Sequence, residues 1–255
     1  MVLVSIFFNG NFDGNGFEIK NIYENTTTKV GLFKSVYGST IKNITISGEI
    51  SGGTASGIVC TANTSKVYNC YNRASVKGGT VGGIVSIVYG DITMINCCNL
   101  GSISGSGYVG GLIGFDDTNG NTKIINCYNI GTIKGGATIG GYSKTAGILG
   151  GAYANGTRNI INCCSNGKLT STGYTIYQTW GGATIGLENC YYSNEMVDET
   201  KKVYANSDAQ GISKNNNEIL EQLNYYVEQH KNEYQVPLYN WKIGEEGYPV
   251  LEYGT

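Results

Sequence analysis

The stretch INCYNIGTIKG, residues 125–135, contains the signals that decide the fold of this chain. Its asparagine, Asn126, stands two residues after the apolar Ile124, and the same pairing recurs along the chain at spacings of 22 to 36 residues. A period in this range indicates a stack of repeated structural units. The seven asparagines are Asn21, Asn43, Asn69, Asn96, Asn126, Asn162 and Asn189, and the apolar residues before them are Ile19, Ile41, Val67, Met94, Ile124, Ile160 and Leu187.

The copies also agree in the residues that follow the asparagine. Cysteine comes next in five copies, at Cys70, Cys97, Cys127, Cys163 and Cys190. Further along, a glycine and then an apolar residue recur, so that one copy consists of three short β runs separated by glycine turns. We predict an all-β fold, a right-handed parallel β-helix (β-solenoid) of about six rungs with three short strands per rung.

Stacking explains why each column keeps one residue type. Rungs that hydrogen-bond at about 4.8 Å place like residues above one another. A column of Ile or Val fills the core, and a column of Asn at a corner can bond amide to amide or to the backbone. We expect the extra residues of the longer copies to form outside loops near 116–122, 140–145 and 152–157.

Composition excludes several classes of protein. Of the 255 residues only 14% are charged, and the formal net charge of −2 gives no reason to expect a nucleic-acid partner. The apolar share of 40% is enough to bury a core. The opening MVLVSIFF is too short to span a membrane and lacks the basic start and cleavage site of a signal peptide, so we predict a strand there and no membrane insertion.

The repeats resemble the GLUG-motif region found in the immunoglobulin A1-specific metallopeptidase family and in bacterial surface or adhesin-like proteins. The resemblance rests on FNGNFDGNG at 8–16, GLF at 31–33, IKNITISGEISG at 41–52, VGGIVS at 81–86 and INCYNIGTIKG at 125–135. WKIGEEGYPVLEY at 241–253 is similar to the segment that often closes such regions. Lys34, Cys60 and Ser86 depart from the motif, because each stands where a second glycine is usual.

The resemblance implies an extracellular or cell-surface protein, but peptidase activity does not carry over with it. A metallopeptidase of that family needs an HExxH zinc helix. The only histidine is His230, in EQHKNEY, and a lone histidine cannot supply that set of ligands. We therefore predict no catalytic centre, no metal and no cofactor.

The tyrosine column is the candidate ligand-binding site. The residue after each repeat cysteine is Tyr71, Cys98, Tyr128, Cys164 or Tyr191, and this column should face outward. Exposed aromatic side chains on a rigid sheet can stack on sugars or anchor a protein partner. The alternative is that Tyr71, Tyr128 and Tyr191 only stabilise the sheet by packing on one another.

Two acidic motifs are weaker candidates. Asp116 and Asp117 are adjacent, and some β-helix glycosidases use a pair of aspartates, but no His, Arg or Lys cluster accompanies this pair, which favours a solvated Asp-rich turn. FDGNG at 12–16 lacks the further carboxylates of an EF-hand loop and is also an ordinary hairpin turn.

The repeats stop after about residue 194, and a different segment follows. We predict a solenoid domain over 1–194 and a C-terminal cap over 195–255, with one helix at about 216–232 and short terminal strands. Ile219, Leu223 and Tyr226, with Leu220 and Val227, form one apolar stripe on that helix. We expect the stripe to close the last rung, since open solenoid ends expose backbone groups. The alternative is a helix that docks a partner or a following domain.

These observations favour a non-catalytic stalk, adhesin or recognition module for a host protein or glycan, or a spacer within a longer surface protein. We expect it to be monomeric. The alternative is a polysaccharide lyase or glycoside hydrolase on a β-helix scaffold, with Asp116 and Asp117 as its carboxylates.

A first prediction concerns the cysteines. A straight column does not converge ligands on a metal, and stacked thiols do not meet the geometry of a disulfide, so all eight cysteines should be free. Alkylation of the denatured, unreduced protein should add eight labels by mass spectrometry. A mass showing fewer labels would contradict the free-thiol column.

Overall fold

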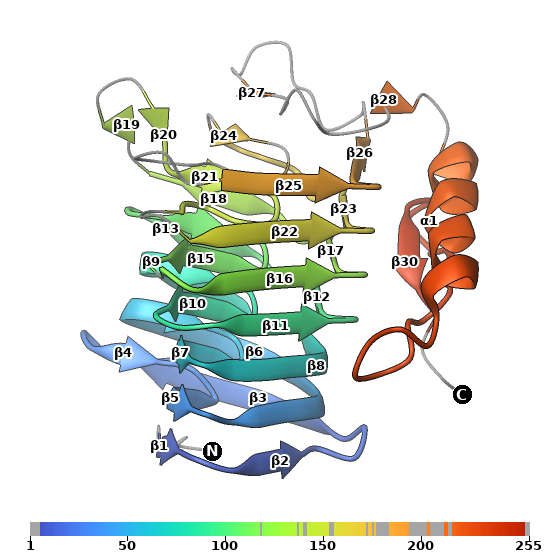
Figure 1. Cartoon of the computed structure of the whole chain (residues 1–255). Coiled ribbons are helices and arrows are strands. Elements are labelled where there is room, and N and C mark those ends of the chain that lie inside the picture. Colours follow the sequence, from blue (N-terminus) through green and yellow to red (C-terminus); the bar gives the residue numbers. More distant parts are fainter. Residues whose placement is uncertain are drawn as a thin grey trace.

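The computed structural model describes residues 6–117, 119–136, 138–139, 142–152, 156–171, 173–174, 176, 184–193, 203–204, 212–213 and 216–252. They form a parallel β-solenoid with one helix and a small hairpin at its side (Figure 1). The front strands in Figure 1 run from left to right as the chain climbs, so the solenoid is right-handed, as predicted.

Three strands make up the coil with the most regular pattern: β7 Val59–Asn63, β8 Ser65–Asn72 and β9 Ser75–Gly82. In the next coil the second and third strands are each divided in two. That coil contains β10 Val85–Val88, β11 Ile92–Ile95, β12 Cys98–Asn99, β13 Ile103–Gly105 and β14 Val109–Gly110.

The other coils repeat this course with small variations. Earlier strands are β1 Ile6–Phe8, β2 Asn11–Asp13, β3 Glu18–Asn25, β4 Lys29–Val30, β5 Phe33–Tyr37 and β6 Thr40–Ser56. Later strands are β15 Ile113–Asp116, β16 Asn121–Ile125, β17 Tyr128–Asn129, β18 Ile133–Gly135, β21 Thr145–Ala146, β22 Thr157–Ile161, β23 Cys164–Ser165, β24 Gly173–Tyr174, β25 Thr184–Glu188, β26 Tyr191–Ser193, β27 Val203–Tyr204 and β28 Ile212–Ser213. The pair β19 Thr138–Ile139 and β20 Tyr142–Ser143 is antiparallel and lies outside the stack.

Parallel pairing in register builds the core. The apolar residues two before the corner asparagines pair coil by coil, from Val67 through Met94 and Ile124 to Ile160 and Leu187. Most of them are fully buried, and they pack with a second inward column made by β7, β10 and β15. The predicted core columns are therefore confirmed.

The repeat asparagines form the corners of the coil. All seven have a left-handed backbone, with φ between 51° and 57°, which Asn tolerates better than most residues do. From Asn69 to Asn189 each side-chain amide donates to the amide oxygen of the asparagine one coil earlier, over 2.5–3.0 Å. The series, which we call the corner ladder, ends where Asn43 donates to the Asp13 carboxylate over 2.9 Å.

A second asparagine ladder lies deeper and was not anticipated. Asn72, Asn99 and Asn129 stand three residues after a corner asparagine and are fully buried. Asn72 donates to Asn99 and Asn99 to Asn129, both over 2.8 Å. Each also donates to the carbonyl of the residue two positions later, which satisfies the turn backbone. Position 131, two residues after Asn129, requires glycine, because an added Cβ would lie 2.1 Å from the Gly101 carbonyl oxygen.

The repeat cysteines point into the core, as predicted, and all eight cysteines of the chain are free and buried. Each repeat thiol donates to the carbonyl two residues earlier, as Cys127 does to Ile125 over 3.1 Å. Burial raises the pKa of the Cys70, Cys127 and Cys190 thiols well above the ordinary value. All five repeat thiols are fully buried, and they fill the core as small apolar groups.

Asp116 is not part of a solvated turn, which corrects the prediction made for 116–122. It is fully buried at the end of β15 and pairs with the equally buried Arg158, whose Nε lies 2.9 Å from the carboxylate. Thr122 donates to the same carboxylate over 2.7 Å, while Asp117 is exposed. The predicted loop is thus shorter, because both Asp116 and Thr122 belong to strands.

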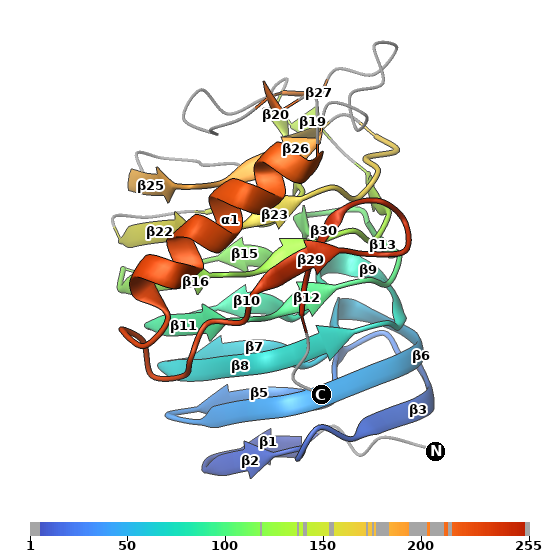
Figure 2. The same cartoon turned by 90° about the vertical axis from the view of Figure 1, so that its right-hand side faces the viewer.

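The C-terminal helix and strands are present, but they lie at the side of the solenoid instead of closing its last rung. Figures 1 and 2 show α1, Asn216–His230, crossing several coils beside the stack. The hairpin of β29 Trp241–Ile243 and β30 Pro249–Leu251 covers the same side. We call residues 216–252 the strap. Stacking also continues beyond residue 194, since β27 pairs with β24 and β28 with β26.

The corner ladder yields a stability prediction. Asn126 and Asn21 have the same left-handed backbone, so alanine at either position carries a strain of about 1–2 kcal/mol. Only Asn126→Ala also removes bonds to Asn96, Asn162 and the strap, and a buried group left unpaired costs about 1–3 kcal/mol. Urea unfolding should show a loss of about 4 kcal/mol for Asn126→Ala and about 1–2 kcal/mol for Asn21→Ala. Equal losses would show that the ladder bonds contribute nothing.

Candidate functional site

The tyrosine column faces away from the core, but the expectation that it is exposed was wrong. Tyr71, Tyr128 and Tyr191 are only 2%, 3% and 5% exposed. The strap covers them, together with Cys98 and Cys164 of the same column. Ligand binding by the column itself therefore stays a prediction, and it holds only where the edge of the strap leaves a ring accessible.

Hydrogen bonds fix the strap to the corner ladder. Asn96 donates its amide N–H to the Pro237 carbonyl over 2.9 Å, and Asn126 donates to the Tyr239 carbonyl over 3.0 Å. The Trp241 indole N–H donates to the Asn126 amide oxygen over 2.7 Å. On the next two coils, carbonyls of α1 take the same role: Asn162 donates to Leu223, and Asn189 donates to Gln222.

A second apolar core joins the strap to the solenoid. The stripe of α1 is buried as predicted, with Ile219, Leu223, Tyr226 and Val227 packed against the tyrosine column. Trp241 lies with its ring centroid 5.7 Å from that of Tyr128. Asn224 links the helix to the hairpin, because its amide donates to the Trp241 carbonyl and accepts from the Trp241 N–H, over 2.9 and 2.7 Å. Helix and hairpin thus form one unit.

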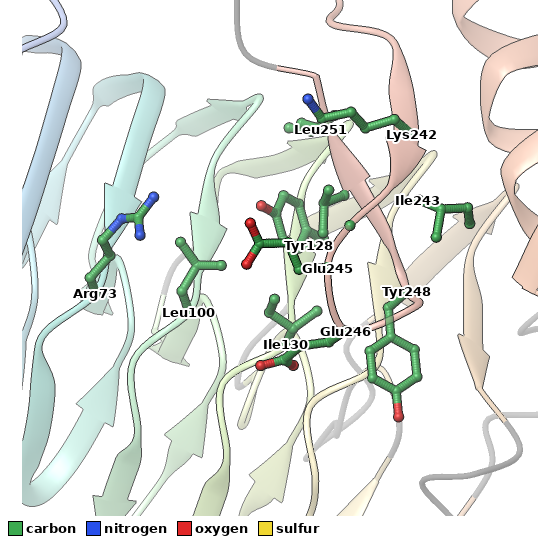
Figure 3. Close-up of a pocket in the computed structure, with 12 residues that line it drawn as sticks. Arg73, Leu100, Tyr128, Ile130, Lys242, Ile243, Glu245, Glu246, Tyr248 and Leu251 are labelled. Carbon is green, nitrogen blue, oxygen red and sulfur yellow. The ribbon is translucent and has the colours of Figure 1, made fainter.

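Beside the hairpin the strap and the solenoid leave an open groove of about 670 Å³ (Figure 3). The solenoid side consists of Arg73, Leu100, Tyr128 and Ile130, and the hairpin side runs from Lys242 to Leu251. We call this space the strap groove. Sequence reasoning missed it, since no residue of one wall lies near the other wall in the chain.

Stacking places the solenoid wall of the groove. Arg73, Leu100 and Ile130 each follow an asparagine of the inner ladder, and those asparagines pair coil by coil. Leu100 and Ile130 are partly buried, so they offer an apolar floor, while Arg73 is exposed at one end. Tyr128, one of the predicted site residues, lies beneath them, and burial raises the pKa of its hydroxyl well above the ordinary value.

The hairpin wall carries charge of both signs. The turn between β29 and β30 contains Glu245 and Glu246, both exposed, and Lys242 precedes it. Figure 3 shows Glu245 and Glu246 on the side of the groove that faces Leu100 and Ile130, with Arg73 beyond Leu100. The groove thus combines an apolar floor with charged side chains at its edges.

Other residues singled out from the sequence lie elsewhere. His230, at the end of α1, is 2.8 Å from the Glu233 carboxylate and stacks on Tyr226. Within the described part of the chain, no three His, Cys, Asp or Glu side chains gather as metal ligands would. No helix in that part is long and apolar enough to cross a membrane. Asp13 of the FDGNG stretch is the acceptor that ends the corner ladder and pairs with Lys42 over 3.1 Å.

Comparison with solved structures finds the same architecture. The chain matches a crystal structure of a "putative immunoglobulin A1 protease" from Bacteroides ovatus with a TM-score of 0.72 and 20% sequence identity. The match covers 97% of this chain and 78% of that one. At this identity the likeness shows the fold alone. No family model matches the chain, and no curated protein does.

The strap interface predicts a loss of stability at alkaline pH. Burial raises the pKa of Tyr68 and of Tyr191 to about 12, from an ordinary value of 10.0. Because the unfolded chain releases these protons first, the stabilisation is complete below pH 10 and is lost as the pH rises towards 12. Melting temperatures measured across this range should fall together with the appearance of tyrosinate absorbance.

Tyr68→Phe serves as the matched variant for this titration. The Tyr68 hydroxyl is buried without a hydrogen-bond partner among the described residues, so its removal should not destabilise the protein at neutral pH. The variant should lose less stability than the parent protein between pH 10 and 12. An unchanged alkaline profile would show that Tyr68 does not contribute.

Proposed function

We propose that this chain is a non-catalytic recognition module of a secreted or cell-surface protein, and that it binds a polypeptide ligand in the strap groove. The observation that carries the proposal is the groove itself, with Leu100 and Ile130 as its floor and charges at its edges. Protein interfaces commonly combine an apolar centre with a polar rim, and charges at the rim orient the partner.

The character of the walls favours a polypeptide over a glycan. A polypeptide can place an apolar side chain on the floor while its charged neighbours meet Arg73 at one side and Glu245 or Glu246 at the other. An uncharged glycan leaves both kinds of charge unmatched. Tyr128 is buried beneath the floor and leaves little ring surface for stacking on a sugar, so partly buried Tyr248 on the hairpin wall is the lining aromatic ring that a sugar would have to use.

Rigidity of the groove supports binding as its role. The floor residues are attached to stacked coils, and the hairpin wall is held through Trp241 and Asn224. A wall that is already ordered loses little conformational entropy when a ligand arrives, which favours affinity.

An extracellular location is part of the proposal. The resemblance of the repeats to GLUG-motif regions of surface proteins supports it. All eight cysteines are buried, so an oxidising compartment would find no accessible thiol among them. The description of the structural neighbour as a "putative immunoglobulin A1 protease" also fits a role outside the cell, although the likeness extends only to the fold.

The enzyme alternative loses one of the two carboxylates on which it was based. Asp116 is enclosed with Arg158 and Thr122 and cannot reach a substrate, which leaves Asp117 alone in the turn. Paired carboxylates on both sides of a glycosidic bond are what the usual glycosidase mechanism requires. The recognition module is therefore the function that we propose.

Binding arrays of extracellular proteins and of glycans, probed with the full chain, test this proposal. The affinity of the strongest protein hit is then measured for Leu100→Arg and for Ile130→Arg, each of which places a positive charge on the apolar floor. We expect each variant to weaken binding about tenfold or more, because central apolar contacts carry much of the binding energy. Lys77→Glu, on the exposed side of β9 and outside the groove, is the control and should bind as the parent does.

Three results would contradict the proposal. One is the absence of any protein hit, and another is protein binding that both floor variants leave unchanged. The third is depolymerisation of a polysaccharide by the purified chain that a point substitution abolishes. Circular dichroism of each variant shows that a loss of binding does not reflect unfolding.

A further inference from the structure

The corner ladder has more hydrogen-bond donors than its own stacking uses. Each asparagine amide carries two N–H groups, and one of them bonds to the preceding coil. On four coils the second N–H donates to a main-chain carbonyl of the strap. The pairs are Asn96 with Pro237, Asn126 with Tyr239, Asn162 with Leu223 and Asn189 with Gln222, over 2.9–3.3 Å.

On the two coils nearer the N-terminal end, the strap does not provide this carbonyl. Among the described residues, Asn69 donates only to Asn43, and Asn43 donates only to Asp13. Both amides are partly exposed and line a hollow of about 220 Å³, together with Thr45, Tyr71 and Tyr239. We call this space the ladder hollow. It directly continues the surface that the strap covers, because Tyr239 belongs to the strap and Tyr71 to the covered column.

From this continuity we infer that the ladder hollow binds an extended segment of a partner polypeptide through main-chain carbonyls. In all four filled positions the second N–H of the ladder meets a main-chain carbonyl. Pro237 and Tyr239, two residues apart, meet asparagines on successive coils. A partner segment would place the carbonyls of residues i and i+2 on Asn43 and Asn69 in the same way.

The walls of the hollow suit such a segment. Tyr239, which is partly buried, provides aromatic surface for one side chain of the segment, buried Tyr71 closes the hollow from below, and Thr45 leaves space because it is small. Main-chain hydrogen bonds supply affinity in this kind of recognition, and neighbouring pockets supply selectivity. The hollow is separate from the strap groove, since the two share no lining residue, and this inference does not depend on the proposed function.

The strap sequence itself supplies a probe. A fluorescein-labelled peptide QVPLYNW, which corresponds to residues 235–241, contains the carbonyls that already meet the ladder. Fluorescence anisotropy with the full chain should show saturable binding with a dissociation constant of about 1 mM or tighter. The absence of saturable binding at protein concentrations up to about 1 mM would overturn the inference.

Two variants locate the binding. In the double exchange Asp13→Asn with Asn43→Asp, the new asparagine at position 13 can donate to the new carboxylate at position 43, so the hydrogen bond is kept with its direction reversed. The net charge is unchanged, but position 43 no longer has an amide N–H group. We expect this double variant to bind the peptide about fivefold more weakly, or weaker still. Thr45→Trp fills the hollow and should abolish binding, while Lys77→Trp on exposed β9 should leave it unchanged.

Unchanged affinity in both the double exchange and Thr45→Trp would overturn the inference, because the peptide would then lie elsewhere. Leu100→Arg, in the strap groove, should leave peptide binding unchanged, so a failure of the proposed function and a failure of this inference are distinguishable. Sedimentation of the chain alone tests self-association. A dimer that Thr45→Trp abolishes would show that a second copy occupies the hollow, and this result would overturn the assignment to a partner polypeptide.

Discussion

The side-chain amide of the corner asparagine is the interaction on which the rest of the structure depends. Asparagine tolerates the left-handed backbone that turns the chain at Asn126 and its counterparts, and its amide has both a donor and an acceptor for the neighbouring coils. A shift of one residue in any coil would break these bonds and would also move the core residues outward. The ladder therefore specifies the register, and the apolar columns provide the stabilisation.

The same amide also explains why the strap lies at the side. Stacking uses one N–H and leaves the other pointing sideways, where a main-chain carbonyl can accept it. The column next to the ladder alternates tyrosine with cysteine, so large and small side chains alternate from coil to coil. This alternation accommodates residues as different as Leu223 and Trp241 in one buried apolar cluster. Polar and apolar contacts thus favour the same placement of the strap.

Both candidate binding sites follow from where the strap ends. The strap groove lies between the hairpin of the strap and the solenoid wall at Leu100 and Ile130. The ladder hollow forms because the strap accepts hydrogen bonds from the corner asparagines of four coils and not from Asn43 or Asn69. Two of the tyrosines proposed as ligand-binding, Tyr128 and Tyr71, each line one of these spaces. Their proposed role is thereby limited to the edges of an otherwise buried column.

The sequence by itself determined the coil. Periodic Asn, Cys and Ile positions were enough to predict the parallel β-solenoid and its inward thiol column, because both depend on contacts between equivalent residues of adjacent coils. The apolar stripe of α1 was predicted separately, from the spacing of apolar residues within the helix itself. Only the tertiary structure decided which surface the stripe covers, since an amphipathic helix indicates that a face is buried but not against what. It also decided the pairing of Asp116 with Arg158, which lie in different coils and belong to no repeated column. The strap groove was unpredictable for the same reason, because its two walls meet only after the strap has docked.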